Sequence, residues 1–261
     1  MSSILTNNGA MVALQTMRST NQNMAKTQSE ISTGMSVATA KDNASSWAIA
    51  STMRTDVAMF DTLSKSLTAN SALVGVARDA SERIVDTLRD MQERMVMLEN
   101  PDSDAPKINA ELASMRENIT SIANNAQFNG INMIGTGGAA QNVTVAIRRD
   151  GGGALTPEVL NIAATDLSGL ATTSLAEIET ALQTAITAAS TFGTAQNRID
   201  AQNDFLKSQS DALKVGIGAL VDADMEEASA RLQALQVQQQ LGIQALSIAN
   251  QQPQNILSLF R

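Results

Sequence analysis

Residues 232–260 decide how this chain folds, and they read LQALQVQQQLGIQALSIANQQPQNILSLF. The stretch holds no Asp, Glu, Lys or Arg, and it alternates Leu, Ile, Val and Ala with Gln and Ser. A lone helix of this composition would expose a large apolar surface to water, so it needs partners. Its apolar residues form two rows, and one partner helix cannot cover both. The rows are Leu232, Leu235 and Leu246, and Val237, Leu241 and Ile248.

The first 33 residues are also nearly free of charge. Their only charged residues are Arg18, Lys26 and Glu30. Apolar side chains recur at spacings that predict one helix face, which would end at Gly34. This face comprises Ile4, Met11, Leu14, Met17, Met24 and Ile31. Two weakly charged helical ends predict that the termini form one module and that the middle of the chain is an insertion between them.

The middle of the chain carries a long coiled-coil pattern. Apolar residues alternate by three and four over 45–100, over 108–125 after a proline-containing turn, and over 172–220. The first of these helices would be about 80 Å long. The seam positions are Phe60, Leu67, Val74, Ile84, Leu88, Met91, Ile119, Ile178, Leu182, Ile199 and Leu213. Polar Asn70 and Ser81 either set the register or are simply tolerated in the seam.

Local signals predict where the elements begin and end. Asp42, Asn43 or Ser45 would cap the second helix, and Asp224 with Glu227 fits an N-cap and its third-position acid. Gly216 and Gly218 predict a loosened backbone before the last helix. The turn at Asn129-Gly130 separates short apolar segments.

Only residues 135–170 have β character. Residues 143–147 alternate in polarity, 148–153 read as a turn, and 155–162 return as a second strand. The glycine-rich turn fits no phosphate-binding motif. The predicted fold is therefore mainly α: a long antiparallel coiled-coil rod of helices from both halves of the chain, with a small β-hairpin at its outer end.

Composition excludes several functional classes. The chain has no Cys and no His, which removes disulfides, thiol nucleophiles, the commonest general base and the commonest metal ligand. A net charge of −8 without a basic patch argues against nucleic-acid binding. No apolar run reaches the roughly 18 residues of a membrane helix, and no secretory signal peptide is visible. We expect no catalysis, no metal and no cofactor, because helix capping explains the acidic residues at 222–227.

Six short motifs resemble those of bacterial flagellins, especially the short flagellins of alphaproteobacteria. The similarity covers residues 1–135 and 172–261, and its motifs are highly specific. They are SEISTG at 29–34, AKDNA at 40–44, WAIA at 47–50, QFNG at 127–130, SIANQ at 247–251 and ILSLFR at 256–261.

The resemblance implies a division of the chain into three parts. Residues 1–34 with 222–261 would form the inner module that lines the filament channel. Residues 35–135 with 172–221 would form the coiled-coil rod. Residues 136–171 would be a short outward hairpin insertion, because the larger outer domains of many flagellins have no counterpart here.

The resemblance also implies a function and partners. The chain would polymerise with itself, and with any other flagellins, into the extracellular filament used for swimming. It would contact the flagellar export apparatus, a secretion chaperone, and the filament cap and junction proteins. Export would occur without a cleaved signal peptide. A hook–filament junction protein, which shares these terminal helices, is the alternative.

One departure from the family concerns immune recognition. Many flagellins carry a run like LQRxRELAVQ that a vertebrate Toll-like receptor reads, and residues 88–97 here read LRDMQERMVM. Asp90 stands in place of the first arginine of that run, between Arg89 and Glu93. We expect weak or absent activation, because an acid replaces a cation at the contact.

Overall fold

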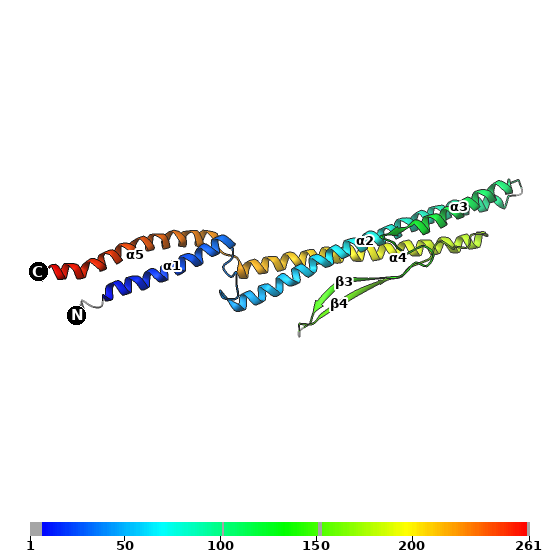
Figure 1. Cartoon of the computed structure of the whole chain (residues 1–261). Coiled ribbons are helices and arrows are strands. Elements are labelled where there is room, and N and C mark those ends of the chain that lie inside the picture. Colours follow the sequence, from blue (N-terminus) through cyan, green and yellow to red (C-terminus); the bar gives the residue numbers. More distant parts are fainter. Residues whose placement is uncertain (1–6, 101, 151–152, 260–261) are drawn as a thin grey trace. The chain divides into compact units, whose positions relative to one another are not determined.

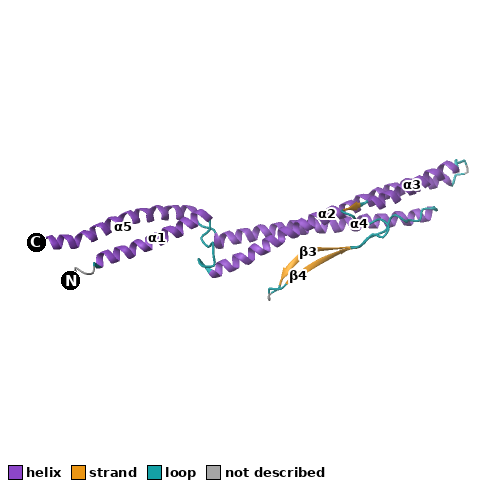
Figure 2. Ribbon diagram, in the orientation of Figure 1, coloured by secondary structure: helices purple, strands orange, loops and turns teal. Residues whose placement is uncertain are grey.

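A computed structural model describes residues 7–100, 102–150 and 153–259. The fold is mainly α, as the sequence predicts, and it has two small antiparallel β-hairpins, one of which lies outside the single predicted β region (Figures 1 and 2). The helices are α1 (Asn8–Thr33), α2 (Ala44–Leu98), α3 (Ala105–Asn125), α4 (Leu175–Val221) and α5 (Met225–Leu259). The strands are β1 (Gln127–Phe128), β2 (Ile131–Asn132), β3 (Gln141–Arg149) and β4 (Leu155–Ile162).

The chain divides into two compact units. The first contains Met1–Asp56 and Ala212–Arg261, and the second contains Val57–Asp211. The first unit therefore joins the two ends of the chain, and the second is one continuous segment between them.

In the first unit, α1 and α5 lie side by side and run antiparallel (Figure 1). The Asn7 amide donates to the Ala249 carbonyl at 2.7 Å, and the Gln239 amide donates to Asn21 Oδ1 at 2.8 Å. The covered positions alternate by three and four along both helices, which is the spacing of a coiled-coil seam. They are Ala10, Ala13, Met17, Thr20, Met24, Thr27 and Ile31 on α1, and Leu232, Leu235, Gln239, Gly242, Leu246 and Ala249 on α5.

A clasp of backbone hydrogen bonds joins the segment that follows α1 to the end of α4 and the residues just before α5. Gly34 ends α1 in the left-handed region, with φ of 71°. The Ser36 amide, the Ser36 hydroxyl and the Val37 amide all donate to the Val221 carbonyl, at 2.7, 3.1 and 3.3 Å. The Ala223 amide donates to the Gly34 carbonyl at 3.0 Å. Val221 is fully buried, so these bonds are shielded from water.

Side-chain caps begin the helices of this unit. Of the predicted caps for α2, the structure selects Asn43, whose Oδ1 accepts the Ser45 and Ser46 amides at 3.1 Å. Asp224 Oδ1 likewise accepts the Glu226 and Glu227 amides, at 3.0 and 3.1 Å.

Glu227 lies in the first turn of α5, as predicted for the third-position acid, and its carboxylate pairs with Arg231 at 2.5 Å, one turn further along. One local prediction about this region was wrong. Gly216 and Gly218 do not loosen the backbone, because α4 continues through both to Val221. A Cβ on Gly218 would lie 2.7 Å from Asp222 Oδ2, so this glycine admits a close side-chain approach.

In the second unit, α2 and α4 pair antiparallel through a ladder of polar side chains. Ser64 donates to Asn203, and Ser71 donates to Asp200 at 2.7 Å. Arg78 then donates to Gln196 at 2.7 Å, and Gln92 to Glu179 at 2.9 Å. The α2 members are separated by seven or fourteen residues, so they share one edge of the helix contact. A slip of either helix would break all of these bonds together, and the ladder therefore sets the register.

Apolar side chains fill the seam of the second unit. Those predicted from the sequence and found buried are Phe60, Leu67, Val74, Ile84, Leu88, Met91, Ile119, Ile178 and Ile199. Leu182 and Leu213 are only half-buried, and Leu213 belongs to the first unit. Ser81 and Asn70 donate to carbonyls of their own helix, Ala77 at 2.7 Å and Ser66 at 2.8 Å. The structure thus favours tolerance over a register-setting role for both.

The predicted Asn129-Gly130 turn joins β1 to β2. Both residues have positive φ, 51° and 80°, as a two-residue hairpin turn requires. Asn132, two residues after the turn, holds the segment against α3. Its side-chain amide donates to the Ala123 carbonyl at 2.8 Å, and its Oδ1 accepts the Ile134 and Gly135 amides at 2.8 Å.

The predicted outer hairpin consists of β3 and β4. Register runs from Gln141 opposite Ile162 to Arg149 opposite Leu155, with a bulge between Thr144 and Ala146. Val143 and Val145 are buried, and Glu158 approaches Arg198 of α4 at 3.9 Å. One face of this two-stranded sheet therefore packs on α4.

The buried seam makes a first testable prediction. Leu88 is fully buried, so we expect Leu88→Ala to lower the free energy of unfolding by about 2–5 kcal/mol through lost burial and a cavity. Urea denaturation followed by circular dichroism measures this. Exposed Asp90 on the same helix supplies the control, since Asp90→Ala should change the value by no more than about 0.5 kcal/mol. Equal effects of the two substitutions would contradict the seam assignment.

The N-terminus of α4 makes a prediction about pH. The Glu177 carboxylate accepts the Thr173 hydroxyl and the Thr173 and Ser174 amides, the latter two at 2.8 and 3.2 Å. These bonds, led by that of the Thr173 hydroxyl, hold the pKa of Glu177 below its ordinary 4.5. A lowered pKa means that the cap stabilises the folded state above the ordinary pKa and is lost as pH falls through the lowered value.

We therefore expect the Thr173 and Ser174 amides to lose hydrogen-exchange protection only below pH 4.5. Amide NMR over an acid titration measures this. Glu177→Gln should remove the pH dependence at these two amides, and an unchanged titration in that variant would assign the effect to another group.

Candidate assembly surface on the terminal helices

The structure divides the twelve predicted assembly residues into two sets. Six lie in the seam between α1 and α5: Met17, Met24, Ile31, Leu232, Leu235 and Leu246. Five face away from the partner helix: Met11, Leu14, Val237, Leu241 and Ile248. Ile4 lies outside the described residues. The predicted set therefore contains both an internal contact and an exposed surface.

The predicted single face of α1 was wrong for Met11 and Leu14. Met11 is 64% exposed, because the seam at this level is formed by Ala10 and Ala13. Further along, Thr20 and Thr27 are buried where the predicted pattern has no member. The sequence analysis looked for large apolar residues and therefore missed a seam formed by small ones. Small side chains allow the two helices to approach more closely. Val12 is also exposed, and the sequence analysis did not identify it.

The exposed row of α5 has the residue spacing of a second helix-packing stripe, but no described helix covers it. Val237, Leu241, Gln244 and Ile248 follow one another at spacings of four, three and four, which repeat one face of a helix. The three apolar members are between 55% and 67% exposed. Helix α1 covers only the other row, as the two-row pattern predicts. Ile243, outside both rows, is also exposed.

Charge is absent from the whole surface of α5 around this stripe. Along α5 itself, the charged residue that comes next before the stripe is Arg231, which already pairs with Glu227 at 2.5 Å. A contact on the stripe therefore desolvates no ion, and neighbouring Gln side chains can both donate and accept hydrogen bonds. Such a surface suits burial against another uncharged helix.

No group of His, Cys, Asp or Glu side chains among the described residues could hold a metal ion. Nor is any described helix long and apolar enough to cross a membrane.

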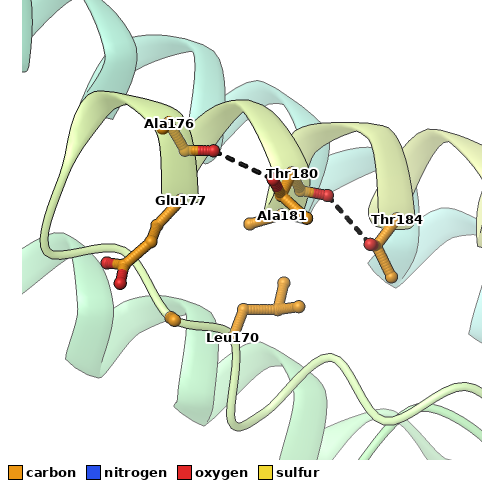
Figure 3. Close-up of a pocket in the computed structure, with 7 residues that line it drawn as sticks. Leu170, Ala176, Glu177, Thr180, Ala181 and Thr184 are labelled. Carbon is orange, nitrogen blue, oxygen red and sulfur yellow. Dashed lines mark hydrogen bonds between the residues drawn. The ribbon is translucent and has the colours of Figure 1, made fainter.

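A hollow of about 280 Å³ lies beside the first turns of α4, lined by Leu170, Ala171, Ala176, Glu177, Thr180, Ala181 and Thr184 (Figure 3). Its polar groups are already engaged. The Thr180 and Thr184 hydroxyls donate to the Ala176 and Thr180 carbonyls at 2.9 and 2.8 Å, and Glu177 caps α4. The hollow therefore offers no activated nucleophile or base.

The stretch resembling a receptor contact lies on α2, in the second unit. Arg89, Asp90 and Glu93 are all exposed there. Arg89 pairs with Asp86 at 3.2 Å, within the same helix. The acidic side chain of Asp90 is therefore accessible on this surface.

Comparison with known proteins agrees with this architecture. The family model of the bacterial flagellin N-terminal helical region matches residues 4–136, and that of the C-terminal helical region matches residues 175–260. The unmatched segment between them contains the β3–β4 hairpin.

Full-length relatives are similar over the whole chain. A flagellin of Brucella melitensis is 39% identical, with 100% of both chains covered. Flagellin FljK of Caulobacter vibrioides is 37% identical, covering 100% of this chain and 99% of its own. Flagellin C of Rhizobium meliloti is 34% identical, again with 100% of both covered. These matches, at both helical ends and over the full length, show that the chain belongs to the bacterial flagellin family.

Proposed function

We propose that this chain is the structural subunit of a helical bacterial flagellar filament and acts outside the cell in swimming. Many copies polymerise, and the paired terminal helices drive the assembly. The observation that carries this proposal is the exposed, charge-free stripe of Val237, Leu241 and Ile248 on a helix whose other row α1 already covers.

Burial of this stripe supplies a driving force for assembly. Apolar surface removed from water contributes about 25 cal/mol per Å², and a polymer repeats the same contact at every subunit. The cost of ordering two chain ends opposes it. Formal charges crowded together in such a contact would be costly to desolvate, and the composition of α5 avoids that cost.

The proposal assigns a place to each part of the chain. Residues 1–34 with 222–261 form the inner module around the channel, 35–135 with 172–221 surround it, and 136–171 face outward. The pairing of α1 with α5 supports the first assignment. The polar ladder between α2 and α4 supports the second, because it stabilises a unit of its own.

Partners follow from the same proposal. The principal partner is the chain itself, with other flagellins as possible members of the same filament. The export apparatus would receive the subunit with a secretion chaperone and without cleavage of a signal peptide. Cap and junction proteins would contact the filament ends. Family membership supports these assignments.

Substitution of the exposed stripe tests the proposal. We expect a triple variant, Val237→Gln, Leu241→Gln and Ile248→Gln, to keep its helix content but to form no filaments, because these side chains leave the α1 contact intact. Electron microscopy and sedimentation of concentrated protein measure assembly. Val96→Gln, at an exposed apolar position of α2, is the matched control and should polymerise normally.

Two further outcomes separate the alternatives. A chain lacking residues 222–261 should form no tubes, and filaments from it would remove the role given to α5. Long filaments from the unmodified chain alone would exclude a junction adaptor, which should not polymerise by itself.

The exposed acid on α2 makes a separate prediction about immune recognition. We expect the unmodified protein to activate the vertebrate receptor weakly or not at all, and Asp90→Arg to raise potency by about tenfold or more, the equivalent of 1.4 kcal/mol. A receptor reporter assay measures this, with Glu93→Gln as a control for simple loss of negative charge. Full potency of the unmodified protein would contradict the assignment.

A further inference from the structure

The seam between α1 and α5 consists of layers, each with one residue from either helix. A Cβ on Gly242 would lie 3.9 Å from Met17 Cε, so these two residues face each other. In an antiparallel pair, equal steps in opposite directions along the two helices lead to the neighbouring layers. Those layers are Ala13 with Leu246, Thr20 with Gln239 and Met24 with Leu235.

The α1 side of the seam nearly repeats itself every seven residues. Large apolar residues recur at Met17, Met24 and Ile31, and small residues alternate with them at Ala13, Thr20 and Thr27. If α1 moved by one heptad, about 10.5 Å, Gly242 would face Met24 in place of Met17. Every residue of α5 from 235 to 246 would likewise meet a residue of similar size, which is what close packing requires.

The polar contact between the helices also has a substitute after such a shift. Gln239 donates to Asn21 at 2.8 Å, and Gln28 lies seven residues after Asn21 on the same exposed edge of α1. The side chain of Gln28 carries the same kind of carbonyl acceptor. The bond that normally specifies register in a seam therefore does not distinguish these two arrangements.

The ends of the helices bear a small cost in the shifted arrangement. Leu232 would lose its cover from α1, and the bond from Asn7 to the Ala249 carbonyl would be lost. Helix α5 continues to Leu259, so the displaced start of α1 would still lie along it. The helices by themselves therefore separate the two registers weakly.

The clasp has no counterpart in the shifted register. Three of its bonds end on the Val221 carbonyl, and the fourth runs from Ala223 to Gly34. A movement of about 10.5 Å would break all four. We propose that the clasp, rather than the packing of the helices, sets the register of α1 against α5. This inference concerns a single chain, so it goes beyond the proposed function and does not depend on it.

The register determines which composite surface a subunit presents. Met11 and Leu14 are exposed on α1, and Ile248 is exposed on α5. A heptad shift would move the first two by about two turns relative to the third. Copies in different registers would therefore present different surfaces, and a contact that repeats from copy to copy needs a single register.

The absence of cysteine permits a direct test with three cysteine pairs. Each pair combines Gly242→Cys with one position on the same face of α1: Met17→Cys for the observed register, Met24→Cys for the shifted one, and Ala10→Cys for the opposite shift. Disulfides require Cα atoms within about 7 Å, which is less than the shift of about 10.5 Å. Dilute chains would be oxidised in trimethylamine oxide, which favours the folded state, and disulfides within one chain quantified by mass spectrometry.

Proline substitutions open the clasp. Ser36→Pro and Ala223→Pro together remove three of its four bonds, namely two amide donors and one hydroxyl. Ala38→Pro, in the same connector, removes none of the four and is the matched control. Circular dichroism would show whether each variant keeps its helices.

We expect the Met17 pair to predominate in the unmodified and control chains. In the double-proline chain the Met24 pair should rise by at least about tenfold, the equivalent of 1.4 kcal/mol, because shielded hydrogen bonds no longer oppose the shift. The Ala10 pair should stay rare in every chain, because the opposite shift would place Leu14 beside Gln239 and leave the amide without that acceptor.

A second variant keeps the clasp intact, so the test does not depend on how the proline chain folds. Duplication of residues 25–31 inserts one heptad into α1 and places Met24 seven residues further from the clasp. If the clasp sets the register, the Met24 pair becomes the main disulfide. Continued predominance of the Met17 pair after this insertion would overturn the inference. An unchanged disulfide ratio in a helical double-proline chain, or equal yields of all three pairs in the unmodified chain, would overturn it as well.

Discussion

A helix can pack only one stripe of its surface against a single partner, and the first unit follows from that constraint. Helix α5 carries two stripes of large apolar residues, whereas α1 covers only the one that includes Leu235. The remaining stripe is left in water without a charge near it to make exposure favourable. Folding of one chain therefore leaves a surface whose burial requires another chain. In the free subunit this apolar stripe is hydrated, which is unfavourable, and its burial on association supplies the driving free energy.

The two units use different chemistry to hold their helices. In the second unit, large side chains such as Phe192 and Leu88 are fully buried, and the polar ladder along α2 fixes one register. In the first, α1 contributes small residues to much of its side of the seam, and each buries little area; they are Ala10, Ala13, Thr20 and Thr27. A subunit built in this way has one part whose packing is complete and another whose packing is finished by assembly.

Much of this architecture could be predicted from the sequence, because it depends on local periodicity. The three-four alternation located α2, α3 and α4, and the Asn129-Gly130 pair located its hairpin turn. The face of α1 could not be found in this way, since alanine and threonine form its seam and Met11 lies outside it. The sequence could not select Asn43 from Asp42, Asn43 and Ser45 as the cap of α2, because several equivalent acceptors compete for the same amides within one turn. The sequence also could not predict which residues of β3 and β4 share a face of the sheet, because a bulge at Val145 shifts the register by one residue.

The clasp at Val221 has a consequence for how the sequence can vary. Its acceptor is a backbone carbonyl, and its donors are the amides of Ser36 and Val37 together with one hydroxyl. The reciprocal bond, from Ala223 to Gly34, is also entirely backbone. Side-chain substitution can delete only the Ser36 hydroxyl among these groups, and only proline at a donor position would remove an amide hydrogen. The clasp is thus insulated from most mutations, so the side chains around it can diverge in composition while the backbone bonds between residues 34–37 and 221–223 persist.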